Sequence, residues 1–403
     1  MVPWVPWLEQ LGRLMAAMRL INPNKTLGVP HQLAFTTEVK FLWITKRLLL
    51  MLPVTFTPAG GMRFRWRSRQ VLIMVSGWMV TSSYMVVAMT SVAKRRFAEL
   101  AGNRLDMVEV APLLVVIAMT TFAFVLPTAV LLSTKSFGRL SCAWQRTEAL
   151  YRSLTGLHLR LGIQALAPTI VVTMIFMSSL VLSLGDSIDI EAWELPPLAH
   201  LVFSDDASSL WCMCHGWICC NIAVASTVRG LAVRLRQDCC RLGVRGVRLH
   251  RLLWMQSVKL LHITCDCYTN INLVYLFYIF VASVAFVFTY IKALFIDSGH
   301  SVGRLLAISV ITLTFFGNIM LMCYPPQMAV DALKVTAREL LRLPMSHQTR
   351  PFRAEVFYFL HDIRLAKDKV TYYGLIDISR SRFVTMFATG TTYIVVMSQM
   401  ALL

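Results

Sequence analysis

Charged residues are scarce in this chain of 403 residues. Asp, Glu, Lys and Arg together make up 15% of the sequence, whereas 57% of its residues are hydrophobic. Soluble globular proteins carry roughly a quarter charged residues. The shortage excludes an ordinary soluble fold and favours a membrane protein, provided that the apolar residues form runs of about 20, the length of a spanning helix.

Seven runs contain no charged residue and are long enough to cross about 30 Å of hydrocarbon as helices. They are 70–92, 110–134, 161–185, 207–228, 267–291, 305–330 and 383–403. The sequence lacks the alternating segments of about ten residues that are typical of a transmembrane β-barrel. We therefore predict an all-α membrane protein with seven spanning helices. A further apolar stretch, 41–56, carries Lys46 and Arg47, so we expect it to lie as an amphipathic helix at the cytoplasmic surface of the lipid bilayer.

The basic residues are unevenly distributed along the chain. Their excess gives a formal net charge of +18, which in a soluble protein would suggest nucleic-acid binding. Thirty of the 39 Lys and Arg residues lie in 1–69, 133–162, 233–270 and 325–379, and only six lie in the alternate loops. The positive-inside rule then places the N-terminus in the cytoplasm and, after seven crossings, the C-terminus outside. The charge indicates topology, and no nucleic-acid partner is expected.

Four regions follow from this pattern. Residues 1–69 form a basic cytoplasmic segment, 70–325 hold helices one to six, 326–379 form a cytoplasmic anchor, and 380–403 form the seventh helix. Within the anchor we expect two amphipathic helices, at 329–343 and 352–369. Their apolar faces, which include Leu333 and Phe359, are expected to hold subunits together. The alternative is that such cytoplasmic helices are merely solvated.

Catalytic motifs are missing: the sequence contains no GxSxG, no HExxH and no phosphate-binding glycine loop. We therefore expect neither an enzyme nor a cofactor. The segments WCMCHGWICC (211–220) and HITCDC (262–267) contain cysteine and histidine, which are zinc ligands. The predicted topology separates the two segments by a membrane thickness. Close packing of small residues is therefore favoured over a metal site.

A ligand pocket is predicted in the outer half of the membrane. His215 is an ionisable residue inside a predicted span, which is typical of functional sites. The other candidates are polar or aromatic residues of the third, fourth and fifth spans, namely Thr173, Ser178, Trp211, Trp217, Phe286 and Tyr290. Tryptophan is enriched at membrane interfaces in any case, so an interfacial role explains Trp211 equally well.

The last predicted helix carries a polar stripe. Its members follow one another at spacings of four, three, four and three and therefore share one side of a helix; they are Thr385, Thr389, Thr392, Val396 and Gln399. Polar side chains at membrane depth pack against protein or face water. The stripe therefore either joins helices or lines a hydrated path. In a hydrated path, Val396 and Gln399 would form the outer constriction.

The segment TTYIVVMSQM, residues 391–400, resembles the C-terminal TYxxxxxQF signature of the insect gustatory receptor family. Thr392, Tyr393 and Gln399 match the signature, whereas Met400 stands in place of its phenylalanine. The upstream segment YYGLIDISRSRF, residues 372–383, also resembles the approach to the last helix in that family.

The resemblance implies a ligand-gated, non-selective cation channel, similar in fold to the odorant co-receptor. In that architecture four subunits surround one pore lined by the seventh helix, cytoplasmic helix ends form a tetrameric anchor, and each subunit has an outer ligand pocket. The chain would be part of a homo- or hetero-tetramer that detects a small-molecule tastant at the plasma membrane of chemosensory neurons.

A seven-helix G-protein-coupled chemoreceptor is the alternative class. Its opposite orientation would fit the glycosylation sequon Asn24-Lys25-Thr26. The basic N-terminal segment argues against that orientation.

Overall fold

A computed structural model describes residues 55–56, 62–65, 67–102, 107–157, 159, 161, 197–295, 302–345, 348–366 and 369–402. Six predicted spans fall on these residues, apart from Leu403 at the end of the last one, and all six are helical. The corresponding helices are α4 (Arg69–Gly102), α5 (Met107–Thr155), α7 (Pro197–Leu242), α8 (Val244–Phe295), α9 (Val302–Leu341) and α11 (Arg380–Leu402). Apart from Leu161, the third predicted span lies outside the described residues.

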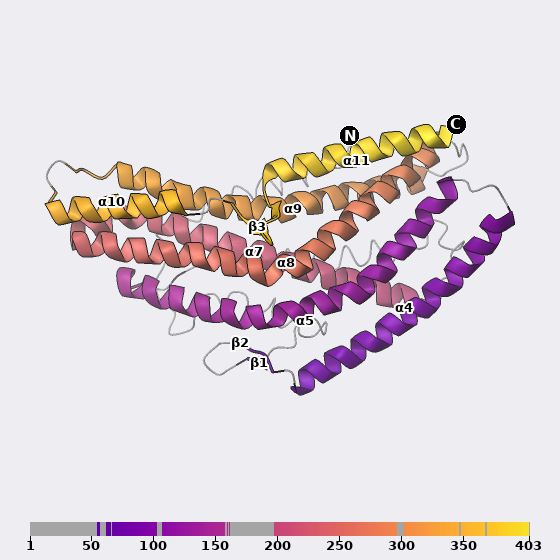
Figure 1. The fold of residues 1–403 in the computed structure, drawn as a ribbon, viewed down its shortest axis with the longest axis horizontal. Coiled ribbons are helices and arrows are strands. Elements are labelled where there is room, and N and C mark those ends of the chain that lie inside the picture. The colour runs from indigo at the N-terminus through magenta and orange to yellow at the C-terminus, as the bar shows by residue number, and fades with distance from the viewer. Residues whose placement is uncertain are drawn as a thin grey trace.

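Most of these helices are much longer than a membrane span. The 52 residues of α8 correspond to about 78 Å at 1.5 Å per residue, more than twice the thickness of the hydrocarbon layer. In Figure 1 the long helices run side by side along the length of the molecule, and α11 extends from its middle to one end. Among the described residues, α4, α7 and α8 contain stretches that are long and apolar enough to cross a membrane.

Helices α7 and α8 continue well beyond the predicted spans 207–228 and 267–291. These two helices meet at Gly243, which adopts a left-handed conformation with φ of 57° and so reverses the chain in a single residue. Gly246 lets the two arms approach closely, because a Cβ atom there would lie 2.7 Å from the carbonyl oxygen of Asp238. The result is a tight helical hairpin.

The predicted anchor helices are present, but their arrangement differs from expectation. The first predicted helix, 329–343, is the end of α9 and stops two residues earlier, at Leu341; the second, α10 (Arg350–Leu365), ends four residues earlier than predicted. Leu333 and Phe359 were expected to hold subunits together, but both are buried within this one subunit, at 7% and 0% exposure. The Phe359 ring lies 5.9 Å from that of Trp254 on α8, so the apolar face of α10 packs against its own chain.

Two short hairpins complete the described structure. Strands β1 (Thr55–Phe56) and β2 (Met62–Arg63) pair antiparallel, as do β3 (Thr371–Tyr372) and β4 (Ile376–Asp377). The predicted amphipathic helix at 41–56 is therefore wrong at its last two residues, and the rest of it lies outside the described residues. The β3–β4 hairpin joins α10 to α11.

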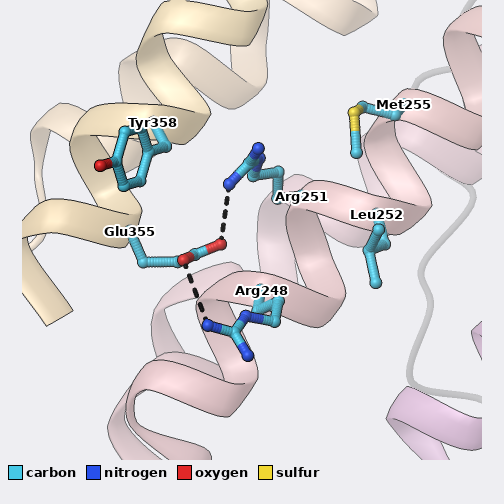
Figure 2. Close-up of a pocket in the computed structure, with 6 residues that line it drawn as sticks. All are labelled: Arg248, Arg251, Leu252, Met255, Glu355 and Tyr358. Atoms are coloured by element: carbon cyan, nitrogen blue, oxygen red, sulfur yellow. Dashed lines mark hydrogen bonds and ion pairs between the residues drawn. The ribbon is translucent and has the colours of Figure 1, made fainter. Parts of the chain in front are cut away.

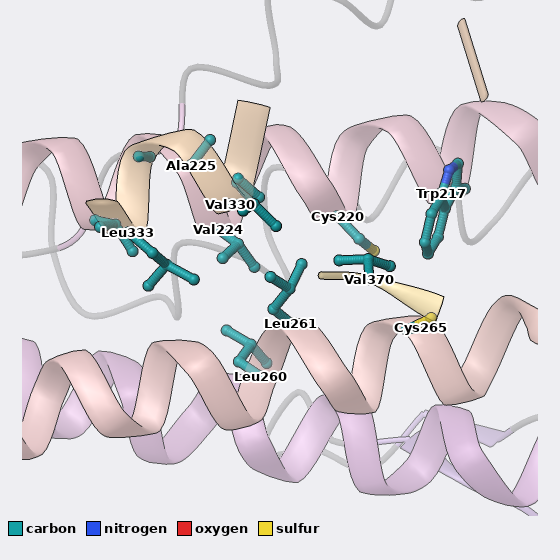
Figure 3. Packing of buried hydrophobic residues seen from close by; sticks show 14 of the residues in the cluster. Trp217, Cys220, Val224, Ala225, Leu260, Leu261, Cys265, Val330, Leu333 and Val370 are labelled. Carbon is teal, nitrogen blue, oxygen red and sulfur yellow. The ribbon is translucent and has the colours of Figure 1, made fainter. Parts of the chain in front are cut away.

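The hydrophobic core runs along the contact of α5, α7, α8 and α9. Figure 3 shows it where Trp217 and Cys220 of α7 face Cys265 and Leu261 of α8. Val370, which directly precedes β3, is buried in the same cluster. The hairpin at the start of α11 is therefore built into the core of the bundle.

Candidate pore helix and ligand sites

The polar stripe of α11 lies on the exposed side of that helix. Thr385, Thr389, Thr392, Val396 and Gln399 are all exposed in the isolated subunit. The packed side is different: Gly390 is buried, and a Cβ atom at this position would lie 3.8 Å from the Phe280 ring of α8. Phe387 packs against Phe316 of α9 with ring centroids 5.1 Å apart. Among the described residues of α11, Gly390 and Phe387 contact α8 and α9, whereas the stripe is left uncovered, as are the off-stripe residues Val384 and Val395.

The three threonines of the stripe share one hydrogen-bonding arrangement. Each hydroxyl donates to the carbonyl oxygen four residues earlier: Thr385 to Ser381 at 3.0 Å, Thr389 to Thr385 at 2.9 Å, and Thr392 to Ala388 at 3.0 Å. A hydroxyl has one hydrogen and two acceptor lone pairs. Because the hydrogen points into the helix, each oxygen keeps acceptor capacity for water or a cation outside it.

The start of α11 is held by the β3–β4 hairpin. Tyr372, which is 1% exposed, accepts a 2.7 Å hydrogen bond at its hydroxyl from the Nδ2 of Asn272 on α8. The next residue, Tyr373, donates its hydroxyl to Asn270 of the same helix. The thiol of Cys265 lies 3.1 Å from the carbonyl oxygen of Thr371. These contacts were not predicted from the sequence, although the YYG segment (372–374) is a turn signal, and Gly374 adopts a φ of 72° there.

Trp217 supplies a hydrogen bond that the backbone of α9 lacks. Pro325 and Pro326 lie inside this helix, and proline has no N–H to donate to the carbonyl oxygen four residues earlier. Pro326 therefore leaves the carbonyl of Met322 without its helical donor. The indole N–H of Trp217 donates to that oxygen at 3.0 Å. A side chain of α7 thus replaces a missing backbone hydrogen bond of α9.

The predicted ligand-pocket residues are only partly described. Thr173 and Ser178 lie outside the described residues; Trp211 lies on α7, and Phe286 and Tyr290 lie on α8, with side chains outside the described part. His215 is buried at 8% exposure. Trp217 is fully buried, with its ring 5.8 Å from Tyr268 and 6.1 Å from Tyr372. Two residues apart on a helix, His215 and Trp217 do not share a face, so the pocket stays a prediction.

A cavity of about 390 Å³ lies between α8 and α10, and none of the predicted pocket residues lines it. Figure 2 shows Arg248 and Arg251 of α8 directed toward Glu355 of α10. Arg251 Nη1 lies 3.0 Å from Glu355 Oε1, and its Nε lies 2.6 Å from Asp362 Oδ2. Arg248 reaches the other Glu355 oxygen at 3.7 Å. Two cations thus meet two carboxylates, and the network ties α10 to α8.

A second charged contact closes the hairpin of α7 and α8. Asp238 and His250 are buried, and their side chains meet at 3.1 Å. Burial alone would raise the pKa of the Asp238 carboxyl. The hydrogen bond and charge of His250, together with Arg234 and Arg241, outweigh burial and hold this pKa below its usual value. Asp238 lies ten residues beyond the predicted span 207–228 and is therefore an ionised contact outside the predicted membrane region. Within the described residues, no three His, Cys, Asp or Glu side chains form a group suited to a metal ion.

Comparisons with known proteins agree with this geometry. The fold is similar to that of the insect olfactory receptor OR5 from Machilis hrabei, with a TM-score of 0.63 at 10% identity over 90% of this chain and 97% of that one. The same receptor in complex with eugenol matches with a TM-score of 0.60 at 11% identity, over 90% and 98% of the two chains.

The sequence itself also has a recognisable relative. It is 21% identical over 371 residues to gustatory and odorant receptor 24 of Anopheles gambiae, which covers 89% of this chain and 77% of the relative. The profile of the 7tm chemosensory receptor family matches residues 51–403. The resemblance inferred from the C-terminal signature is therefore confirmed, and this chain belongs to the 7tm chemosensory receptor family.

Proposed function

We propose that this chemosensory receptor is a ligand-gated, non-selective cation channel that detects a small-molecule tastant. Four subunits, identical or mixed, surround one pore, and α11 of each subunit lines it. The basic N-terminal segment and α10 lie in the cytoplasm, and the C-terminus lies outside. The receptor acts in the plasma membrane of chemosensory neurons.

The uncovered polar stripe of α11 is the observation that carries this proposal. From residue 383 onward α11 carries no charge, and a helix face in contact with lipid alone would gain nothing from a row of threonines, because polar groups are disfavoured in hydrocarbon. Their oxygens keep acceptor capacity on the exposed side, and oxygen atoms are the ligands that hard cations prefer. A symmetric set of four such helices would form a hydrated, oxygen-lined path.

The outer end of the stripe is the proposed constriction. Val396 is 46% exposed, and Gln399 follows it one turn closer to the C-terminus. An apolar ring can exclude water when the helices approach, whereas an amide can contact a hydrated ion when they separate. Val396 therefore acts as the gate and Gln399 as the outer mouth, with the threonines lining the wetter path below.

Small-molecule gating has support from the fold. The olfactory receptor of similar fold has a structure in complex with eugenol. In the present chain the ligand binds in the outer half of the bundle, where His215 is a candidate contact. A panel of tastants, applied to cells that lack other receptors, identifies the ligand class.

Subunit assembly uses the exposed apolar residues at the α10 end of the molecule. Leu341, Phe357 and Leu365 have exposures of 70%, 67% and 69% in the isolated subunit. All three lie on α10 or at the end of α9, and exposed apolar patches are typical of protein interfaces. They take the role that Leu333 and Phe359, which are buried within the subunit, do not have.

Cysteine accessibility tests the pore assignment. In cells that express Gln399→Cys, a charged thiol reagent applied outside alters the current, and in Val396→Cys it does so mainly while the channel is open. Val395→Cys is the matched control, since Val395 is also exposed, at 50%, but lies off the stripe; its current is unchanged. Well-expressed variants whose currents ignore the reagent at both 396 and 399 contradict the proposal.

A further inference from the structure

Arg380, the first residue of α11, contacts α9 on both sides of its two prolines. Its guanidinium carbon lies 4.7 Å from the centre of the Tyr324 ring, and its Nη2 lies 3.6 Å from Asp331 Oδ2. Tyr324 directly precedes Pro325, whereas Asp331 follows Pro326 by five residues. The other Asp331 oxygen accepts a 2.9 Å hydrogen bond from Gln327 Nε2. One side chain of α11 thus bridges the interrupted turn of α9.

Consecutive prolines make this turn of α9 the natural place for bending. Each proline removes one backbone hydrogen bond, and its ring crowds the preceding turn, so helices kink at such positions. Any change of bend at Pro325 and Pro326 alters the separation of Tyr324 from Asp331. Arg380 can therefore keep both contacts only over a narrow range of bend angles.

The two attachments of the α11 root differ in strength. The β3 attachment is buried, since Tyr372 and Asn272 are 1% and 0% exposed, and breaking it would leave polar groups unpaired in the core. The Arg380–Asp331 pair is half exposed, with side-chain exposures of 56% and 46%. Exposed ion pairs are weak and break readily. The β3–β4 hairpin therefore stays attached to α8 and acts as a fixed pivot, whereas the contacts of Arg380 with α9 can break.

We infer that Arg380 couples the bend of α9 at Pro325–Pro326 to the position of the first turn of α11. When the bend changes, Arg380 loses its contact with either Tyr324 or Asp331. The first turn of α11 is then free to rotate about the β3–β4 hairpin. Arg380 is a positioning residue, because it acts on the permeation path through α11. This inference rests on the proposed function only in that α11 lines the pore.

Hydrogen–deuterium exchange of the full-length receptor in phosphatidylcholine nanodiscs tests the coupling without a ligand. Arg380→Gln speeds exchange roughly fivefold both in the first turns of α11 (380–387) and in α9 after the prolines (327–331). Asp331→Asn has a similar effect, and the double variant adds little. Arg382→Gln is the matched control, since Arg382 lies on the same turn with the same charge and has no ion pair within the described part of the chain. Faster exchange in α11 alone, or an equal effect of the control, overturns the inference.

Spontaneous single-channel currents of the purified receptor in planar bilayers provide the second measurement. Arg380→Gln changes the ratio of open to shut time roughly fivefold at constant conductance. Arg380→Lys, which keeps the charge needed for topology but stacks poorly on an aromatic ring, gives a smaller change. Tyr324→Phe keeps the ring and leaves the ratio unaltered. Currents with unchanged open times in Arg380→Gln overturn the coupling. If no protein conducts, wild type included, while the exchange results hold, the channel proposal fails and the coupling of α9 to α11 stands.

Discussion

Replacing Trp217 by phenylalanine should destabilise the protein, because the prolines of α9 leave the Met322 carbonyl oxygen with no other donor. The change keeps an aromatic ring in the contact with Tyr268 and Tyr372 but removes the N–H that lies 3.0 Å from the Met322 carbonyl oxygen. That oxygen then has no donor, because residue 326 is proline. The variant should therefore be destabilised by more than its loss of volume.

The magnitude has two parts. An unsatisfied carbonyl in a packed interior costs about 1–3 kcal/mol. The smaller ring leaves a void of roughly 40 Å³, which costs about 1 kcal/mol at about 24 cal/mol per Å³. Trp217→Phe should therefore lower the free energy of unfolding by about 2–4 kcal/mol.

A second substitution separates the two parts. Pro326→Ala supplies a backbone N–H to Met322, so in the Trp217→Phe background it should recover about 1–3 kcal/mol. Pro325→Ala is the matched control, because its new N–H serves Leu321 and leaves Met322 without a donor. The assay is chemical denaturation of the full-length receptor in detergent, followed by circular dichroism. Equal effects of the two proline variants in the Trp217→Phe background would refute the assignment of Trp217 as the replacement donor.

Three further predictions concern assembly, charge and topology. Phe357→Asp should reduce the tetramer fraction in detergent while the subunit stays folded, whereas Phe359→Asp, at a fully buried position, should unfold the subunit; the same loss of tetramer without unfolding in both would contradict the assignment. Asp238→Asn should cost about 1–3 kcal/mol at pH 7. The pKa of Asp238 is lower in the folded protein than in the unfolded one. Its contribution to stability is therefore complete above the unfolded pKa and is lost as pH falls through the folded pKa, so the stabilities of wild type and variant should converge as pH falls below about 3.8. A constant difference in acid would be inconsistent with this. Asn24 should remain unglycosylated in cells and a C-terminal tag should be labelled on intact cells; a glycan at Asn24 would reverse the topology and favour the G-protein-coupled class.

Local periodicity explains what could be predicted from the sequence. The spans on the described residues were recognisable because an uncharged run of about 20 residues has few folds available in lipid. The stripe of α11 follows from spacing alone, since residues three and four apart share a helix face. Its uncovered position in the subunit agrees with that pattern.

Pairings between distant residues could not be predicted in the same way. Trp217 and Met322 are 105 residues apart, and Asn272 and Tyr372 are 100 apart. Neither partner of such a pair carries a local signal that names the other. The amphipathic pattern of α10 likewise indicated an apolar face but not its partner: Phe359 packs within the subunit, whereas neighbouring Phe357 stays exposed.

The two prolines of α9 lie inside a helix that a local sequence rule would end there. Consecutive prolines ordinarily end a helix. Residues 305–341 nevertheless form one continuous helix: Trp217 of α7 replaces the hydrogen bond that Pro326 cannot make to Met322, and Arg380 of α11 contacts residues on both sides of the prolines. Tertiary contacts here override a local rule.

The most direct test of the pore is a single-channel recording of the purified receptor with Gln399→Glu. If the stripe of α11 lines a cation path, a carboxylate from each subunit at its outer mouth raises the local cation concentration. Conductance and the permeability ratio between cations should then differ from those of the wild type, whereas Val395→Thr, a polar change off the stripe, should leave both unchanged. Wild-type conductance and selectivity in a well-expressed Gln399→Glu receptor would show that ions pass elsewhere and would contradict the account.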